Sequence, residues 1–310
     1  MAETKHRLIT RSDFDGVTCA ALFRELDMID EIKFVHPKDM QDGSVLVTDK
    51  DITANLPYVR GVHMAFDHHA SETVRLDSLP DNLVIDPKAP SAARVVYDHY
   101  GGKKAFANIA DDLIEAVDKG DSGRFDKNEI LAPTDWVLLN FIMDARTGLG
   151  AFRDFDISNH QMMVDLVDYC RSMPIGRILE QEDVKQRADL YFEQAGKASE
   201  QIKKCTEVRE NLGILDLRGE ATIFAANRFL VYALFPGINI SMHVLWGPNN
   251  LKTVFAIGKS VLNRTSKTNI GELMLHYGGG GHENAGTCRI EPSEAETVKE
   301  ELIARITKDG

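Results

Sequence analysis

The amino-terminal part of the chain alternates between short hydrophobic runs and stretches with apolar residues at helical spacing. Five runs are typical of short buried strands: residues 8–10, 32–35, 45–48, 62–66 and 83–85. After the first of them, residues 17–28 place apolar side chains on one face of a helix, namely Ala20, Ala21, Phe23 and Leu26. Strands that alternate with helices favour a parallel sheet wrapped by helices, so the pattern predicts an α/β domain.

The middle of the chain has a mostly helical pattern. Apolar residues recur at helical spacing over four segments: residues 91–100, 105–117, 133–145 and 159–171. A long polar helix is then predicted over residues 175–205. Its charged positions are typical of a solvated connector: Glu180, Glu182, Lys185, Arg187, Glu193, Lys197 and Lys203.

Strand patterns return after Gly213. The predicted strands are residues 214–217, 221–224, 238–245 and 253–257, and the predicted helices are 228–234, 270–276 and 293–307. The sequence thus predicts two α/β domains: residues 1–190 with a mainly parallel sheet, and a smaller mixed-sheet domain at residues 209–310. Residues 191–208 would form the helical connector between them.

Composition and charge narrow the classes of function. The 310 residues are 43% hydrophobic and 27% charged, which is ordinary for a soluble globular protein. The net charge of -12 argues against a surface that binds long duplex nucleic acid, but it allows a local basic pocket for a small phosphorylated ligand. The four cysteines form no Cys-x-x-Cys pair, and the sequence has neither a signal-peptide core nor a membrane-length apolar run. We therefore expect a cytoplasmic protein that does not enter the membrane.

Acidic and imidazole side chains follow three of the predicted strands. They are Asp13 and Asp15 after residues 8–10, Asp49 after residues 45–48, and Asp67, His68 and His69 after residues 62–66. Carboxyl ends of parallel strands meet at one edge of a sheet, so we expect these side chains to converge. Each motif alone would also fit a solvated turn. Together they favour manganese-like ions, of which two can hold a phosphoryl group.

Two further segments add candidate residues. Asp118 and Asp121 follow the predicted helix at 105–117, where either would also fit as a polar helix end. The segment at residues 277–286 contains four consecutive glycines followed by His282. Glycine permits positive φ and close approach of the backbone to a ligand, so this segment is predicted to bind an anion rather than to act as a linker.

These motifs resemble those of the DHH phosphoesterase superfamily, named for its Asp-His-His triplet, in the form that carries a DHHA1 substrate-binding domain. The resemblance covers almost the whole chain and includes members such as nanoRNases and exopolyphosphatases. It implies a metal site built from Asp13, Asp15, Asp49, His68 and Asp121. It also implies that His69 contacts the substrate phosphate and that Asp67 orients the triplet.

The resemblance implies one or two Mn²⁺ ions as cofactor, with Mg²⁺ or Co²⁺ as alternatives. For the second domain it implies a substrate-binding surface made by Arg264, Gly279, Gly280, Gly281 and His282. The expected reaction is hydrolysis of a phosphodiester or phosphoanhydride bond in an inter-domain cleft. Expected substrates are a short oligonucleotide, a nucleotide or polyphosphate, and a homodimer is allowed.

One position differs from the family pattern. Family members carry a histidine four residues before the first aspartate or an acid two residues before it, where this chain has Ile9 and Arg11. Neither side chain can serve as a metal ligand in these positions. This leaves a second hypothesis open: a nucleotide-binding sensor of the same family that is catalytically weak or inactive.

Overall fold

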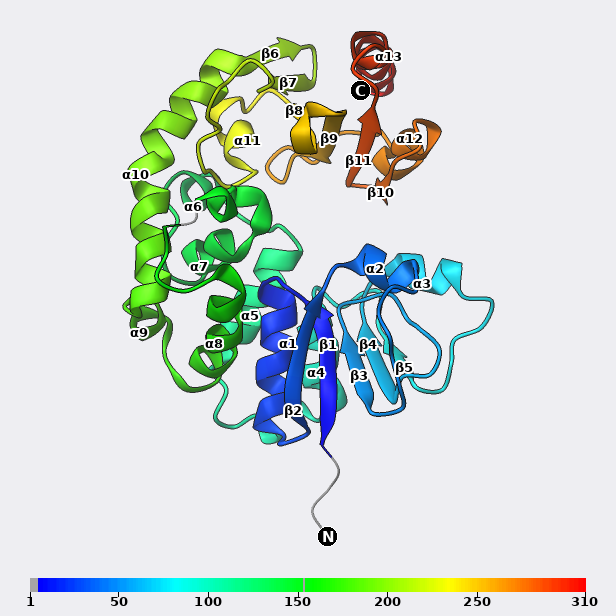
Figure 1. Ribbon diagram of the computed structural model, residues 1–310, viewed down its shortest axis with the longest axis vertical. Coiled ribbons are helices and arrows are strands. Elements are labelled where there is room, and N and C mark those ends of the chain that lie inside the picture. The colour runs from blue at the N-terminus through cyan, green and yellow to red at the C-terminus, as the bar shows by residue number, and fades with distance from the viewer. Residues whose placement is uncertain (1–4, 153) are drawn as a thin grey trace. The chain divides into compact units, whose positions relative to one another are not determined.

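The computed structural model describes residues 5–152 and 154–310 (Figure 1). The chain forms two compact units. The first consists of Met1–Arg124 and Pro133–Leu190, and the second of Phe125–Ala132 and Tyr191–Gly310. The division of the sequence into a domain at 1–190, a connector at 191–208 and a domain at 209–310 stays a prediction.

A five-stranded parallel sheet forms the centre of the first unit (Figure 1). Its strands run in the order β2-β1-β3-β4-β5, with β1 (His6–Arg11), β2 (Ile29–Val35), β3 (Asp51–Ala54), β4 (Met64–Asp67) and β5 (Leu83–Ile85). Every pairing in it is parallel. The expected α/β fold with a parallel first sheet is confirmed, and all five carboxyl ends therefore lie along one edge.

Helices pack around this sheet. The central one, α1 (Phe14–Glu25), is almost entirely buried and packs against α4 (Ala92–His99), α5 (Asp111–Asp121) and α8 (Asn159–Ser172). The remaining helices of the unit are α2 (Pro37–Gln41), α3 (Ala70–Arg75), α7 (Asp135–Met143) and α9 (Ile175–Leu179), with 3₁₀ turns at η1 (Gly102–Lys104), η2 (Ala145–Thr147) and η3 (Leu149–Ala151). Since α1 follows β1 directly, its first turn lies at the carboxyl edge of the sheet.

The predicted strand at residues 45–48 is wrong. The strand that joins the sheet is β3, six residues later, and it pairs with β1 from Arg7–Asp51 to Thr10–Ala54. Val45 and Val47 instead pack in a small apolar cluster with Ile9, Met40 and Leu56, while Leu46 is 80% exposed. The hydrophobic run is therefore explained by packing in this cluster and not by a place in the sheet.

The helix predicted over residues 175–205 is interrupted. It ends as α9 at Leu179 and resumes as α10 (Glu182–Cys205). The helix is also less solvated than its charges indicated, because Arg187 is only 1% exposed. The Arg187 guanidinium donates to the Oδ1 atom of Asn159 and to the backbone oxygens of Ile157 and Asp183.

A six-stranded mixed sheet forms the centre of the second unit. Its order is β10-β11-β9-β8-β7-β6, with β6 (Thr206–Arg209), β7 (Leu212–Asp216), β8 (Ile240–Trp246), β9 (Thr253–Lys259), β10 (Gly280–His282) and β11 (Ala285–Ile290). Only β7 and β8 pair in parallel. The expected mixed sheet is confirmed, but residues 221–224 form no strand.

One face of this sheet carries the core of the second unit. Buried residues from β7, β8, β9 and β11 pack with apolar residues of α12 (Ile270–His276) and α13 (Ala295–Asp309). The other elements of the unit are α6 (Lys127–Leu131), α11 (Leu230–Leu234) and η4 (Pro248–Asn250). Helix α6 lies between α5 and α7 in the sequence but packs against α11.

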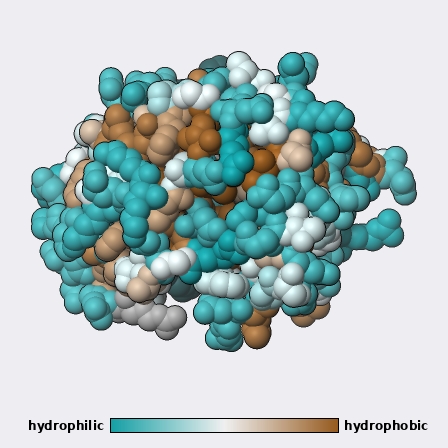
Figure 2. All heavy atoms as spheres, turned by 90° about the horizontal axis from the view of Figure 1, so that it is seen from above, coloured by the Kyte–Doolittle hydropathy of each residue, from teal (hydrophilic) through white to brown (hydrophobic). Residues whose placement is uncertain are grey.

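The face drawn in Figure 2 is mainly hydrophilic, with smaller hydrophobic areas between the polar side chains. Large exposed apolar residues are spread over different elements, as with Val74 in α3 and Leu275 in α12. Among the described residues, no helix combines the length and apolar character that crossing a membrane would require.

Candidate metal centre

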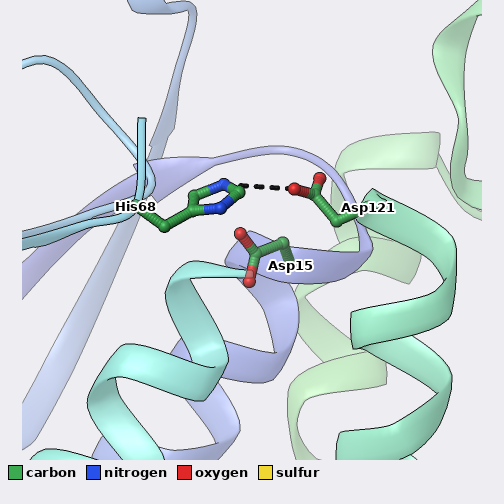
Figure 3. A group of neighbouring side chains, drawn as sticks. All are labelled: Asp15, His68 and Asp121. Carbon is green, nitrogen blue, oxygen red and sulfur yellow. Dashed lines mark ion pairs between the residues drawn. The ribbon is translucent and has the colours of Figure 1, made fainter. Parts of the chain in front are cut away.

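Three side chains from distant parts of the chain meet at the carboxyl edge of the parallel sheet (Figure 3). Asp15 lies in the first turn of α1, His68 directly follows β4, and Asp121 is the last residue of α5. One ligand atom from each lies within 4.8 Å of the others, and the Nε2 atom of His68 is 3.1 Å from an Asp121 oxygen. Two carboxylates and an imidazole form a donor set that suits manganese-like divalent ions.

The orientation of His68 is set by the backbone. Its Nδ1 atom lies 3.2 Å from the carbonyl oxygen of Ala89, so this nitrogen carries the proton and donates it. In the neutral form that a metal ligand requires, the lone pair is then on Nε2, the nitrogen that faces Asp121 and Asp15. Because a ligating histidine usually donates its other nitrogen to a carbonyl or carboxylate, His68 fits a metal ligand.

Asp15 is held at the amino end of α4. Its two oxygens accept hydrogen bonds from the backbone N–H groups of Ala92, at 2.9 Å, and Ala93, at 2.7 Å. The side chain is only 2% exposed. Burial and the nearby charge of Asp121 raise the pKa of Asp15 to about 7, although His68 opposes the rise. A cation bound here would favour the ionised carboxylate.

His68 and Asp121 influence each other. Burial alone would lower the pKa of His68, but the contact with Asp121 and the charge of Asp15 outweigh it and raise this pKa to about 9. Burial would likewise raise the pKa of Asp121, but the contact with His68 holds it below its usual value. The group therefore stabilises a positive charge between its carboxylates.

The neighbouring Asp118 has a different environment. Its oxygens accept from the Ser91 hydroxyl at 2.7 Å and from the Arg94 guanidinium at 2.6 Å. Ser91 in turn caps α4 by accepting from the backbone of Arg94. Of the two aspartates near the end of α5, Asp121 thus faces the histidine while Asp118 joins helices α4 and α5.

The rest of the triplet lies beside this group. Asp67 is buried, and its Oδ1 atom accepts from the backbone N–H of His68 at 2.9 Å and from the ring of His69 at 2.7 Å. Burial lowers the pKa of His69, but the bond to Asp67 more than compensates and raises it. Asp67 thus holds the backbone of His68 and the ring of His69 through one oxygen, and its role in orienting the triplet stays a prediction.

Asp13 does not join the three-residue group. It is the N-cap of α1, and its Oδ1 atom accepts from the backbone of Gly16 at 3.0 Å and from the Asn55 amide at 3.1 Å. The other oxygen pairs with Arg11 at 2.9 Å. Burial raises the pKa of Asp13, and Arg11 opposes this. The structure thus surrounds this expected metal ligand with N–H donors.

Asp49 is not brought to the site at all. It is exposed and precedes β3, whereas the metal group lies beyond the carboxyl ends of the strands. The four residues of β3 alone span about 13 Å, so Asp49 lies at the opposite edge of the sheet. The residue at the carboxyl end of β3 is Asn55, which the sequence analysis missed. In the sequence, the only indication of Asn55 as a residue at a strand end is that it follows the β-branched residues Ile52 and Thr53.

The glycine-rich segment is a β-hairpin rather than a loop. Gly280, Gly281 and His282 form β10, which pairs with β11. An added Cβ would come within 2.2 Å of backbone at Gly279 and 2.3 Å at Gly281, while nothing lies within 4 Å at Gly280. Two of these glycines are therefore required by packing. Exposed Arg264 lies between β9 and α12, and substrate binding by these residues stays a prediction.

The chain is similar to proteins of known structure. The chain is 52% identical to a pGpG-specific phosphodiesterase, PggH from Vibrio cholerae, with a TM-score of 0.86 over 99% of this chain and 100% of that one. RecJ from Thermus thermophilus in complex with Mg²⁺ matches at 13% identity and a TM-score of 0.51, which indicates a common fold. The match covers 99% of this chain but 50% of RecJ. No protein-family model and no curated protein matches the chain.

Proposed function

Because the chain belongs to the DHH superfamily of phosphoesterases, we propose that it is a metal-dependent phosphodiesterase that cleaves pGpG or a similar short linear dinucleotide. The observation that carries the proposal is the convergence of Asp15, His68 and Asp121 at one edge of the sheet. The full-length identity of 52% to a pGpG-specific phosphodiesterase supports the substrate class.

Asp15, His68 and Asp121 would hold the ion. When bound there, a divalent cation supplies Lewis acidity that polarises the phosphodiester and activates the attacking water. Mn²⁺ suits two carboxylates and an imidazole, and Mg²⁺ or Co²⁺ are the alternatives. The backbone N–H groups of Ala92 and Ala93 and the carbonyl of Ala89 fix the directions of the Asp15 and His68 side chains.

His69 would act on the substrate phosphate. Its Nδ1 atom donates to Asp67, and this bond favours the protonated ring. A protonated imidazole beside the metal group can donate to a non-bridging oxygen, where negative charge grows in the transition state. Asp67 would act as a positioning residue, because it contacts both histidines and is itself 1% exposed.

The second unit would bind the remainder of the dinucleotide. At Gly280 nothing lies within 4 Å of an added Cβ, so packing does not explain this glycine. His282, two residues later, is exposed. Arg264 would contribute a guanidinium for the terminal phosphate. A cytoplasmic location and a homodimer also stay predictions.

The direct experiment incubates the purified protein with pGpG and Mn²⁺ and follows the products by chromatography. Hydrolysis of the phosphodiester should release two GMP per pGpG, and a chelator should stop it. Polyphosphate, 3′-phosphoadenosine 5′-phosphate and a cyclic dinucleotide serve as competing substrates. Release of phosphate from polyphosphate with pGpG left intact would refute the proposed substrate class.

The inactive sensor is not favoured. A chain 52% identical over its full length is a phosphodiesterase, and the three candidate ligands here are brought together. The sensor hypothesis would regain support if pGpG bound tightly and remained uncleaved with Mn²⁺, Mg²⁺ and Co²⁺.

A further inference from the structure

A second cluster of polar side chains lies beside the metal group, and it contains its own positive charge. Asp13 accepts from Gly16 and Asn55 through Oδ1, and its Oδ2 atom is 2.9 Å from the Nε atom of Arg11. The register of β1 and β3 explains the meeting, since Thr10 lies opposite Ala54 and the next residues along each strand are Arg11 and Asn55.

This cluster does not fit a second divalent ion. Both oxygens of Asp13 already face N–H groups, and one of these groups is a permanent cation. The Asn55 amide must present its nitrogen to Asp13, because the opposite orientation would place two oxygens 3.1 Å apart without a proton. Ile9, in the same strand, is fully buried and apolar. A dication next to Arg11 would also be repelled by it.

Arg11 keeps donors for a ligand. Its side chain is 37% exposed, and the contact with Asp13 is made through Nε. Among residues 5–152 and 154–310, neither Nη group of Arg11 donates a hydrogen bond to another residue. The charge of Arg11 also acts on Asp121, so the guanidinium lies close enough to influence the metal group. A guanidinium of this kind binds phosphate oxygens through paired N–H groups.

We propose that the centre holds one divalent ion and that Arg11 supplies the second positive charge, binding a non-bridging oxygen of the substrate phosphate. Asp13 positions the guanidinium by pairing with Nε, and Asn55 fixes Asp13. The inference rests on the proposed phosphodiesterase activity for its catalytic part. Its prediction of a single ion is independent of the substrate.

The first test counts ions. Equilibrium dialysis with Mn²⁺ should give one tightly bound ion per chain in the wild type, and the Mn²⁺ paramagnetic resonance spectrum should show no exchange-coupled pair. Arg11→Met should keep this single ion. The double variant Arg11→Asp/Asn55→Asp supplies two carboxylates and should bind a second ion. Two tightly bound, coupled ions in the wild type would overturn the proposal.

The second test measures how much the positive charge of Arg11 contributes to catalysis. Arg11→Met should lower kcat/KM for pGpG by about 100-fold, as expected for loss of a group that stabilises transition-state charge. Arg11→Lys should recover part of this loss, because the charge returns without the planar fork. Arg24→Met is the matched control: Arg24 pairs with Asp168 at 2.7 Å and is 27% exposed. It lies about 14 Å along α1 from Asp15 and should leave kcat/KM unchanged.

A third variant separates substrate contact from simple neutralisation of Asp13. If Arg11 only balanced the Asp13 charge, Arg11→Met/Asp13→Asn would restore activity because no charge is left unpaired. If Arg11 binds phosphate, the double variant stays as impaired as Arg11→Met. Rescue by the double variant would overturn the role of Arg11. Absence of Mn²⁺-dependent hydrolysis in the wild type would instead refute the proposed function, while the ion count would remain valid.

Discussion

Asp13 and Asp15 are two residues apart after the same strand, yet the structure gives them different environments. Asp15 accepts from two backbone N–H groups and faces His68 and Asp121. Asp13 is paired with Arg11 and Asn55. Asp15 thus belongs to the group that would hold the proposed cation, while the charge of Asp13 is already paired with that of Arg11. The sequence motif Asp-x-Asp does not distinguish these roles, because the partners come from other strands and helices.

The largest effect is expected when the metal group itself is broken. His68→Ala should lower kcat/KM for pGpG by about 10⁴-fold, since the charge stabilisation supplied by the ion is worth several kcal/mol. Bound Mn²⁺, measured by dialysis, should be lost as well. Asp49→Ala is the control because Asp49 lies at the opposite edge of the sheet, and it should leave activity within about twofold. An equal loss in both variants would contradict the placement of the site.

The second-largest effect is expected from a change in the turn between β1 and α1, which carries Asp13 and Asp15. A Cβ on Gly16 would lie 1.9 Å from the carbonyl oxygen of Arg11, so Gly16→Ala requires the β1–α1 turn to move. We expect about 3 kcal/mol of lost stability, together with loss of activity. Gly280→Ala is the matched control, with nothing within 4 Å of its Cβ, and should change stability by less than about 0.5 kcal/mol. Urea unfolding of both variants measures the difference, and equal midpoints would refute this role of Gly16.

A smaller effect should separate the two aspartates directly. Asp15→Asn removes a ligand charge and should weaken Mn²⁺ binding by at least about 100-fold. Asp13→Asn keeps a good N-cap for α1 and should leave Mn²⁺ affinity within about threefold. Calorimetric titration with Mn²⁺ gives both constants. Comparable losses for the two variants would show that Asp13 is a ligand after all.

The smallest expected effect comes from a comparison of two histidines, His68 and His243, whose pKa values shift in opposite directions. Carboxylates raise the pKa of His68, but burial in β8 lowers the pKa of His243 to about 4. The unfolded chain then takes up a proton near pH 6.5 while the folded protein does not, so stability falls as the pH drops from about 6.5 to about 4. His243→Gln should remove on the order of 1 kcal/mol of this dependence. Identical pH profiles of unfolding for both proteins would contradict the shift.

Much of the architecture could be predicted from local patterns. Short apolar runs followed by acids or imidazole identified β1 and β4, and the rule that parallel strands end at one edge predicted that Asp15 and His68 converge. Asp121 follows a helix and was added to them only by the family resemblance. These predictions succeeded because each residue lies within a few positions of the element that carries it. The family resemblance added the role of Asp67, which a local pattern could not supply.

The errors have non-local causes. Residues 45–48 have a strand pattern, but the neighbour that pairs with β1 is β3, so Asp49 was placed at the wrong edge. Asn55 was missed because a neutral amide is not a usual metal ligand. The hairpin of β10 and β11 was missed because glycine is a poor strand former, and only the close packing against Thr287 and Ala285 explains it.

Anomalous scattering from a crystal soaked in Mn²⁺ would locate the ion relative to Asp15, His68 and Asp121. We expect one manganese peak in the first unit, bonded to Asp15, His68 and Asp121, with Arg11 still paired to Asp13. A peak coordinated by Asp13 or Asp49, or no peak among the three side chains, would contradict it.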